Sequence, residues 1–366
     1  MTSRIYLDNN ATVPLRPSVR EAVVAALEIT GNPSSVHSFG RDARRIVEEA
    51  REQVAGALGT RPGQVILTGG GTEANIMVLR GFPGRRILVS AIEHDSVLKA
   101  VDSPVLIPVR PDGTVSLEVL QEMLAEGSGA ALVSVMLANN ETGVIQPLDR
   151  VVEMACRYGA LVHTDAVQAV GKMPVDFSAL GVDLLSVSAH KVGGPPGVGA
   201  LVVRDGLDIE PLLRGGGQER RRRAGTENVP GIAGFGEAMA ALDSLCPPDM
   251  ALWRDRMESE ILKQEPRVRI CGRESLRLPN TSCLLVPGIP ASKQLMALDL
   301  EGIAVSAGSA CSSGKLQASH VLRAMGLSEA DASCAIRISA GWQTVPDHLD
   351  RFVEAWTSMV RRCHIS

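Results

Sequence analysis

The sequence is poor in aromatic residues and has no long apolar run. Aromatic residues make up 3% of the 366 positions, and no stretch approaches the ~18–20 uninterrupted apolar residues that a membrane helix needs. The first ten residues, MTSRIYLDNN, also lack the apolar stretch of a secretory signal. We therefore expect no membrane-spanning segment and no membrane partner.

Cysteine occurs in an odd number and in no regular pattern. The seven cysteines include no CxxC pair and stand at Cys156, Cys246, Cys271, Cys283, Cys311, Cys334 and Cys363. This spacing favours neither a disulfide framework nor a metal site, and it fits a reducing cytoplasm. We expect most of these residues to be small buried side chains, with one or two reactive thiols at most.

The sequence also has no large excess of positive or negative charge. The net charge is −4, with 45% hydrophobic and 21% charged residues, which is the balance of an ordinary globular enzyme. We expect no general attraction to nucleic acid. The one basic run, Arg220–Arg223, is predicted to lie on a solvated face.

Short apolar runs alternate with amphipathic stretches, which indicates an α/β fold. Strands are predicted at Gln64–Thr68, Arg86–Val89, Ala130–Met136, Ala160–His163, Leu184–Val187 and Gly199–Val203, and helices at Arg41–Leu58, Leu148–Tyr158 and His348–Arg361. The strands show little alternation, as expected when both faces of a mostly parallel sheet are covered. A Cys-Pro-Pro turn near 245–249 suggests a large domain over 15–245 and a small domain formed by 1–14 and 246–366.

Polar clusters follow several of these strands, where α/β sheets bind ligands. The glycine-rich loop GGGTEAN at 69–75 could hold a phosphate with its N–H groups and the Thr72 hydroxyl, or could be only a tight turn. It does not meet the spacing of a dinucleotide fingerprint. His94 could stack on a flat ring or exchange protons, or be a hydrogen-bonded loop residue. Asn139–Glu141 could serve as a cap and turn.

Two charged residues end neighbouring strands. Asp165 follows an apolar strand, and a carboxylate at that depth needs a positive partner, either a protonated pyridine nitrogen or a structural arginine. Lys191, in SVSAHKVGGPPG, stands among small residues in a confined setting. Burial of such a lysine lowers its pKa toward the neutral amine that forms a Schiff base.

With these motifs in place, the sequence resembles the cysteine desulfurases of the class V aminotransferase group, in their NifS/IscS-like branch. The resemblance covers nearly the whole chain, through the motifs YLDNNAT, GNPSS, GGTEAN, EHDSV, NNETGVIQP, HTDAVQAVGK, SAHKVGGPPGVGAL, AGTENV, SAGSACSSG and RISAG. It implies a pyridoxal-phosphate-transferase fold of type I. This fold has a large domain with a mostly parallel seven-stranded sheet flanked by helices, and a smaller α/β domain carrying the Cys311 loop and Arg337.

The resemblance also implies the cofactor, pyridoxal 5'-phosphate, and its contacts. Lys191 would hold it and later move protons, Asp165 would pair with the pyridinium nitrogen, and His94 would stack on the ring. The phenolic oxygen would be bound by Asn140 and Gln168, and the phosphate by Gly71, Thr72, Ser188, His190 and, from the second subunit of a homodimer, Thr226. Arg337 would clamp the carboxylate of the substrate, with Asn140 beside it.

Cys311 stands in a run of small residues, SAGSACSSG, from which no packed core would be built. By the resemblance it takes sulfur from L-cysteine, leaves L-alanine, and carries a persulfide to an acceptor such as an iron–sulfur scaffold protein. Two positions depart from the family pattern. Arg221 stands where relatives have glycine, and Gly70 stands where many have serine.

Three alternatives remain open from the sequence. A selenocysteine lyase, or another pyridoxal-phosphate enzyme of the class V aminotransferase type, would use the same site. A non-catalytic partner in sulfur transfer would not need Lys191, Asp165, Cys311 and Arg337 together. A nicotinamide-dependent oxidoreductase is the most distant, because the fingerprint is missing.

Overall fold

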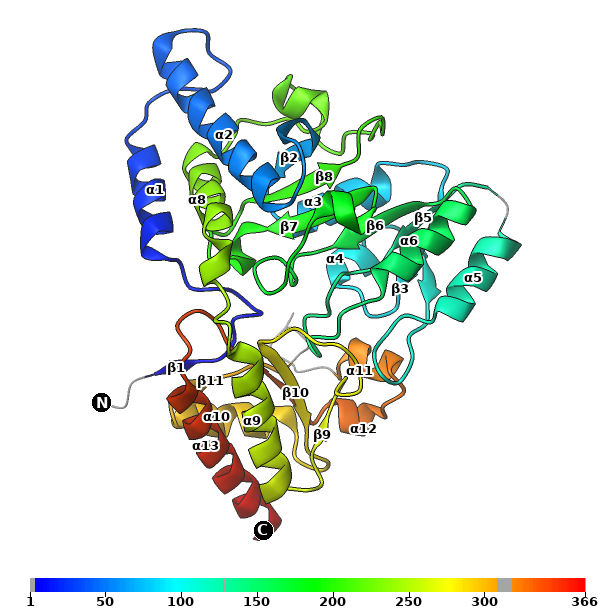
Figure 1. The fold of residues 1–366 in the computed structure, drawn as a ribbon, viewed down its shortest axis with the longest axis vertical. Helices are drawn as coiled ribbons and strands as arrows, with labels where there is room; N and C mark the ends of the chain where they lie inside the picture. Colours follow the sequence, from blue (N-terminus) through cyan, green and yellow to red (C-terminus); the bar gives the residue numbers. More distant parts are fainter. Residues whose placement is uncertain (1–3, 128, 308–317, 366) are drawn as a thin grey trace.

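The protein is described by a computed structural model that covers residues 4–127, 129–307 and 318–365. A seven-stranded sheet fills the upper part of Figure 1, and two smaller sheets with long helices form the lower part. None of the helices in the described ranges combines the length and the apolar character that crossing a bilayer requires.

The large sheet has the strand order β2-β8-β7-β6-β5-β3-β4. Its strands are β2 (Val65–Thr68), β3 (Arg86–Ser90), β4 (Val105–Ile107), β5 (Ala131–Ser134), β6 (Leu161–Asp165), β7 (Leu184–Ser188) and β8 (Gly199–Val203). Only β8 runs antiparallel to its neighbours, and the other pairs are parallel. The prediction of a mostly parallel seven-stranded sheet is therefore confirmed.

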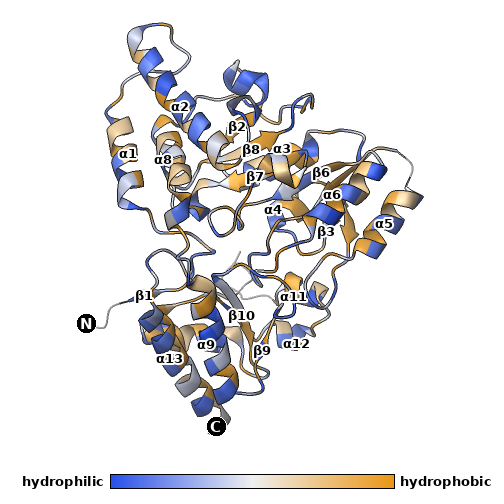
Figure 2. Cartoon of the chain, in the orientation of Figure 1, coloured by the Kyte–Doolittle hydropathy of each residue, from blue (hydrophilic) through white to orange (hydrophobic). Residues whose placement is uncertain are grey.

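Helices cover both faces of this sheet. They are α1 (Pro17–Leu27), α2 (Ser38–Ala57), α3 (Gly71–Arg80), α4 (Asp95–Leu98), α5 (Leu117–Glu126), α6 (Leu148–Arg157), α7 (Phe177–Leu180) and α8 (Val229–Ala240). Neighbouring residues of one strand enter different cores: Leu185 lies in the apolar cluster of α2 and α8, and Leu184 lies in that of α3. Because both faces are buried, the strands read as continuous apolar runs, and Figure 2 colours them as hydrophobic.

The lower part of the molecule combines both ends of the chain. It contains β1 (Ile5–Tyr6), β9 (Arg269–Ile270), β10 (Thr281–Leu285), β11 (Ile303–Ala304), β12 (Ala335–Ser339), α9 (Met250–Gln264), α10 (Ala291–Leu300), α11 (His320–Ala324), α12 (Glu329–Ala332) and α13 (Pro346–Ile365). Strand β1 pairs in parallel with β11, and β10 pairs antiparallel with β12 and β9. Its apolar core includes the fully buried Phe352 and Trp356 of α13.

The basic run adopts an uncommon backbone. Glu219, Arg220 and Arg221 have φ values of 46°, 56° and 67°, in the left-handed region that suits glycine. The glycine that the family resemblance implies at position 221 would adopt such a φ without strain. The buried ion pair of Glu219 with Arg51, with Nη1 to Oε2 at 2.7 Å, anchors the bend to α2.

The arginines of this run do not all face solvent as predicted. Arg220 and Arg222 donate to the carbonyl oxygen of Gly63 at 3.1 and 3.0 Å. Arg223 pairs with Glu73 at 2.8 Å. The run therefore ties its loop to the sheet domain, because two of its guanidinium groups donate to a backbone carbonyl of the turn before β2.

Candidate active site

Lys191 lies in a single 3₁₀ turn, Ala189–Lys191, directly after β7. Its Nζ donates to the carbonyl oxygens of Asn10 at 2.6 Å and Ala11 at 2.7 Å. Burial, with the positive charge of Arg337 as the next cause, lowers the pKa of Lys191 to about 8. The neutral amine, which is the form that attacks a carbonyl, is therefore far more accessible near physiological pH than in an ordinary lysine.

Asp165 ends β6, the strand next to β7 in the sheet. It is 7% exposed, and its two oxygens accept hydrogen bonds from Val167 N at 2.9 Å and Asn75 Nδ2 at 2.7 Å. Both donors are neutral amides, so the structural-arginine alternative finds no support in these contacts. A buried carboxylate held in this way favours a cationic ligand atom beside it.

Glu93 is a second buried carboxyl group near Asp165. It is 0% exposed, and its Oε1 accepts a hydrogen bond from Met136 N. Burial, with the negative charge of Asp165 as the second cause, raises the pKa of Glu93 well above its usual value. Burial and the neighbouring Asp165 carboxylate thus both favour the protonated form of Glu93.

His94 belongs to a directed chain of hydrogen bonds. Asn75 Nδ2 donates to Asp165 and also to Ser96 Oγ at 2.8 Å. Ser96 contacts His94 Nδ1 through its backbone N at 3.1 Å and its Oγ at 2.8 Å. Because the backbone N–H can only donate, Nδ1 is an acceptor and a neutral His94 carries its proton on Nε2. The ring itself is exposed.

The N-terminus of α3 faces β7. A Cβ added to Gly71 would come within 2.9 Å of Val167 Cγ2 and 3.4 Å of Ser188 Cβ, so the space beside this helix start depends on glycine. Gly70 has a φ of +141°, which other residues rarely adopt. Thr72 is exposed in the first turn. Free N–H groups at a helix start bind anions.

Arg337 lies on β12 and reaches across to the large sheet. Its Nη1 donates to the Asn140 carbonyl oxygen at 3.0 Å, and its Nη2 pairs with Asp8 Oδ1 at 2.6 Å. It is 4% exposed, and its Nε has no hydrogen-bond partner among the described residues. A buried guanidinium with an unused donor is suited to a carboxylate ligand.

The remaining predicted residues differ in whether they contact the residues around Lys191. Gln168 Nε2 donates to the Asn10 carbonyl oxygen at 2.9 Å. His190 Nδ1 lies 3.3 Å from Thr12 Oγ1, and burial followed by the charge of Lys191 lowers the pKa of His190 to about 4. Thr226 is exposed in the loop before α8. Cys311 lies outside the described residues.

Several functional neighbours were missed by the sequence reasoning. They are Asp8, Asn10, Ala11, Asn75, Glu93 and Lys172. Asp8, Asn10 and Ala11 stand in the motif YLDNNAT, and its position next to β1 could have drawn attention to them. Asn75 and Lys172 end quoted motifs and Glu93 begins one, but nothing in the sequence distinguishes them from packing residues.

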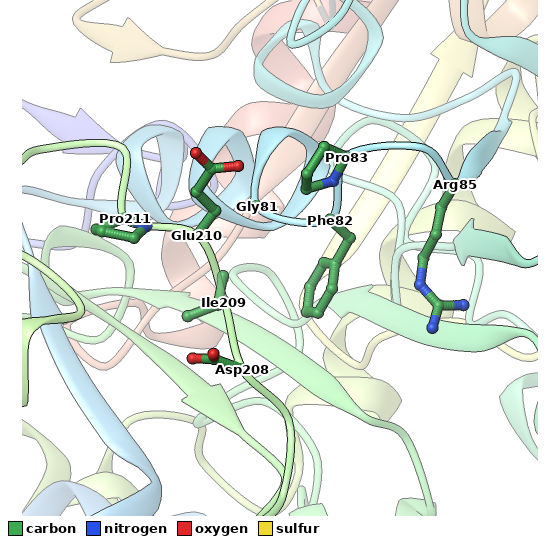
Figure 3. Close-up of a pocket in the computed structure, with 8 residues that line it drawn as sticks. All are labelled: Gly81, Phe82, Pro83, Arg85, Asp208, Ile209, Glu210 and Pro211. Carbon is green, nitrogen blue, oxygen red and sulfur yellow. The ribbon is translucent and has the colours of Figure 1, made fainter.

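A separate pocket of about 390 Å³ lies at the other end of α3. Figure 3 shows Phe82 and Ile209 lining it, with Arg85 and Pro211 at its two ends. Helix α3 has 10 residues, or roughly 15 Å, so this pocket lies well away from its N-terminus. It also lies away from the carboxyl ends of the strands, where ligands bind. None of the predicted site residues lines it.

Comparisons with known proteins agree with the geometry at the carboxyl edge of the sheet. A family model for class-V aminotransferases matches residues 5–352. The chain belongs to the class-V aminotransferase family. Within this family, a cysteine desulfurase of Cereibacter sphaeroides is 43% identical over 98% of this chain and 96% of its own length. An IscS-like cysteine desulfurase of Mycobacterium tuberculosis is 40% identical over 98% and 96% of the two chains.

Solved structures of the family agree as well. A NifS-like protein from Rickettsia africae has a TM-score of 0.90 and 36% identity, and the match covers 98% of this chain and 100% of that one. The chain is therefore a pyridoxal-phosphate-dependent enzyme of the cysteine desulfurase type. These findings confirm the family, the fold, the cofactor and the enzyme class predicted from the motifs.

Proposed function

We propose that this class-V aminotransferase family member removes sulfur from L-cysteine, with Lys191 holding pyridoxal 5'-phosphate and Cys311 accepting the sulfur. In the net reaction, L-cysteine and the Cys311 thiol give L-alanine and a Cys311 persulfide. The cofactor supplies an electron sink conjugated to the substrate carbon. One observation carries the proposal. Lys191, whose pKa is lowered, lies close enough to Asp165 and Arg337 at one edge of the sheet to feel their charges.

The residues fit this cofactor at both of its ends. Asp165 offers a buried anion without a cationic hydrogen-bond donor, which a pyridinium nitrogen would complete. The start of α3 offers free N–H groups and a space that a side chain at Gly71 would fill, as a phosphate requires. Phosphate contacts are proposed for Gly71, Thr72, Ser188, His190 and, from a second subunit, Thr226.

Proton handling is assigned to Lys191 and His94. The carbonyl oxygens of Asn10 and Ala11 hold the Lys191 amine when it is free of the cofactor, so the amine stays near the site as an acid or base. His94 would stack on the ring with Nε2–H turned toward the site. Gln168 and Asn140 would bind the phenolic oxygen.

Arg337 would bind the substrate carboxylate. Its pairing with Asp8 means that the substrate carboxylate must share the guanidinium with Asp8, or displace it. The unused Nε and the planar fork allow a second carboxylate to be bound with directional hydrogen bonds. Asn140, whose carbonyl oxygen accepts from Arg337, would lie beside this carboxylate.

The described flanks of the Cys311 segment support its role. Before it, Ser306 pairs with Arg337 as an isolated bridge. After it, His320 Nε2 lies 2.9 Å from the carbonyl oxygen of Glu93, the residue next to His94. The described residues on the two sides of the segment therefore contact Arg337, which is proposed to bind the substrate, and the residue before His94, which is proposed to bind the cofactor.

The test is product formation by the purified holoenzyme. With L-cysteine and a thiol reductant, sulfide and alanine should form in equal amounts. Lys191→Ala should abolish both products, and Cys311→Ala should abolish sulfide formation. Full desulfurase activity in Cys311→Ala would contradict the role of that thiol. A higher kcat/KM for selenocysteine than for cysteine would instead identify a selenocysteine lyase.

Four broader statements belong to the same proposal. We propose a homodimer with shared sites, and a sulfur-acceptor or iron–sulfur scaffold protein as the partner that takes the persulfide. The division into 15–245 and 1–14 with 246–366 is supported by separate apolar clusters around the large sheet and around α13. A cytoplasmic location follows from the cysteine pattern alone.

A further inference from the structure

Lys172 is a buried lysine that the proposed mechanism does not use. It is 8% exposed, and its Nζ donates to Gln168 Oε1 at 2.6 Å and to Asn10 Oδ1 at 2.8 Å. Both of these partners are neutral amides. A lysine at this depth is unusual unless its nitrogen has a specific task.

The surroundings of Lys172 offer no compensating carboxylate in the described contacts. Lys172 also lines a small cavity together with Asn9, Val13, Leu245, Cys246, Asn280, Ala340 and Gly341. Burial, followed by the charges of Lys191 and Arg337, lowers the pKa of Lys172 well below its usual value. The two hydrogen bonds from Nζ each end on a neutral amide oxygen, so neither of them supplies a negative charge to the ammonium form.

The contacts of Lys172 decide how the Gln168 amide is oriented. Lys172 Nζ donates to Gln168 Oε1, which places the oxygen of that amide on the side of Lys172. The Nε2 group then turns the other way and donates to the Asn10 carbonyl oxygen at 2.9 Å. That same carbonyl oxygen accepts from Lys191 Nζ at 2.6 Å. Lys172 and Lys191 are thus connected through one residue, Asn10, whose side chain contacts Lys172 and whose carbonyl oxygen contacts Lys191.

Asn10 is held from several sides. Its Oδ1 accepts from Lys172 and from Asn280 Nδ2 at 3.2 Å, and its Nδ2 donates to Thr281 Oγ1 at 2.9 Å and to the Asn140 carbonyl oxygen at 3.1 Å. The N-terminal segment is therefore fixed against both parts of the molecule. Of these bonds, only the one from Lys172 also orients Gln168.

We propose that Lys172 is a positioning residue of the Lys191 site, which fixes the Gln168 amide with Nε2 toward the cofactor and the Asn10 carbonyl oxygen toward Lys191. This inference rests on the proposed function, in which Gln168 binds the phenolic oxygen. Without Lys172 the Gln168 oxygen loses its donor, and only the bond from Nε2 to the Asn10 carbonyl oxygen still holds the amide. In a flipped amide, the oxygen would face the phenolic oxygen of the cofactor and repel it.

The test uses Lys172→Met, which keeps length and volume but has no donor, with Lys293→Met as the control. Lys293 is exposed on α10 and far from these contacts in the chain. Lys172→Met should weaken pyridoxal-phosphate binding roughly three- to tenfold, the loss of one oriented hydrogen bond. It should also raise the pH at which the visible spectrum of the bound cofactor changes, because the phenolic oxygen loses a donor. Lys293→Met should change neither quantity.

A double-mutant cycle with Gln168→Met distinguishes positioning from a structural role. If Lys172 acts through Gln168, the double variant should bind the cofactor about as weakly as Gln168→Met alone. Additive losses, or a lower melting temperature of the cofactor-free protein with unchanged cofactor affinity, would overturn the inference. If Lys172→Met fails to fold, Lys172→Gln carries the same cycle. A wild-type protein that binds no pyridoxal phosphate would overturn the proposed function instead.

Discussion

At the scale of single residues, the charges around Lys191 act in opposite directions. Arg337 disfavours the ammonium form, whereas Asp165 favours it, and burial lowers the pKa of Lys191 to about 8. The neutral fraction of the amine therefore rises through pH about 8. In cofactor-free protein, Arg337→Met should move this midpoint upward, toward the ordinary value of 10.5, and Asp165→Asn should move it downward.

The measurement is reductive methylation over a range of pH, read for each lysine by mass spectrometry. Labelling of Lys191 is divided by that of the exposed Lys293 in the same sample, which cancels changes in the reagent. Equal midpoints in the two variants would contradict the electrostatic account.

Asp165 should matter more for turnover than for folding. Asp165→Asn preserves size and can still accept a hydrogen bond from Val167, but removes the charge that a pyridinium nitrogen needs. Hydrogen bonds to charged groups contribute about 1.5–3 kcal/mol, so kcat should fall at least about tenfold. Asp183→Asn is the matched control, because Asp183 accepts from Val162 N at the start of the same strand. Asp183→Asn should leave kcat within about twofold of the wild-type value. An equal fall of kcat in both variants would indicate a structural effect alone.

Residues with a chemical signature could be found from the sequence, and residues that act through their backbone could not. Lys191 and Asp165 were found because a lysine or aspartate at a strand end is chemically unusual. Asn10 and Ala11 hold Lys191 through carbonyl oxygens, which every residue has. Lys172 was missed because its burial depends on segments that lie 162 positions apart in the chain.

At the scale of elements, the start of α3 is the proposed phosphate site. Gly71→Ala would place a methyl group 2.9 Å from Val167 Cγ2, inside the space that the phosphate needs. We expect at least about tenfold weaker cofactor binding, because one displaced charge-assisted hydrogen bond is enough for that loss. Cofactor titration and thermal unfolding of the cofactor-free protein measure the two effects separately.

Gly56→Ala provides the control for that glycine. Gly56 lies inside α2, and a Cβ there meets nothing within 4 Å. This change should stabilise the fold by up to about 1 kcal/mol and leave cofactor binding unchanged. Unaltered cofactor affinity in Gly71→Ala would place the phosphate elsewhere.

In the large sheet, the strands buried on both faces were predicted well and the exposed edge strand β4 was missed, whereas no strand of the smaller sheets was predicted. The six strands read from apolar runs all exist, with ends shifted by at most two residues. Strand β4 was not predicted, because it has three residues, begins next to Pro104, and lies at the edge of the sheet with Val105 40% and Leu106 50% exposed. An edge strand gains its structure from its single neighbour, β3, which the local sequence does not reveal.

At the scale of the whole molecule, the site exists only after the two ends of the chain meet. Asp8 pairs with Arg337, and β1 pairs with β11. Such closures join residues more than 300 positions apart, so no local pattern predicts their register. The family resemblance implied that motifs at both ends of the chain belong to one site. The ion pair between Asp8 and Arg337 was seen only in the structure.

The same scale includes the proposed second subunit. Thr226 is exposed in this chain, on a loop that the Arg51–Glu219 ion pair holds against the sheet domain. If Thr226 binds the phosphate in the partner's site, Lys191→Ala chains and Thr226→Asp chains should complement each other. In a mixed dimer one site would carry both changes and the other would carry neither. Chains mixed equally after unfolding and refolding should regain about a quarter of wild-type activity, since half the dimers are mixed and each has one intact site. Activity no greater than the average of the two parent variants would mean that Thr226 serves its own subunit or no site at all.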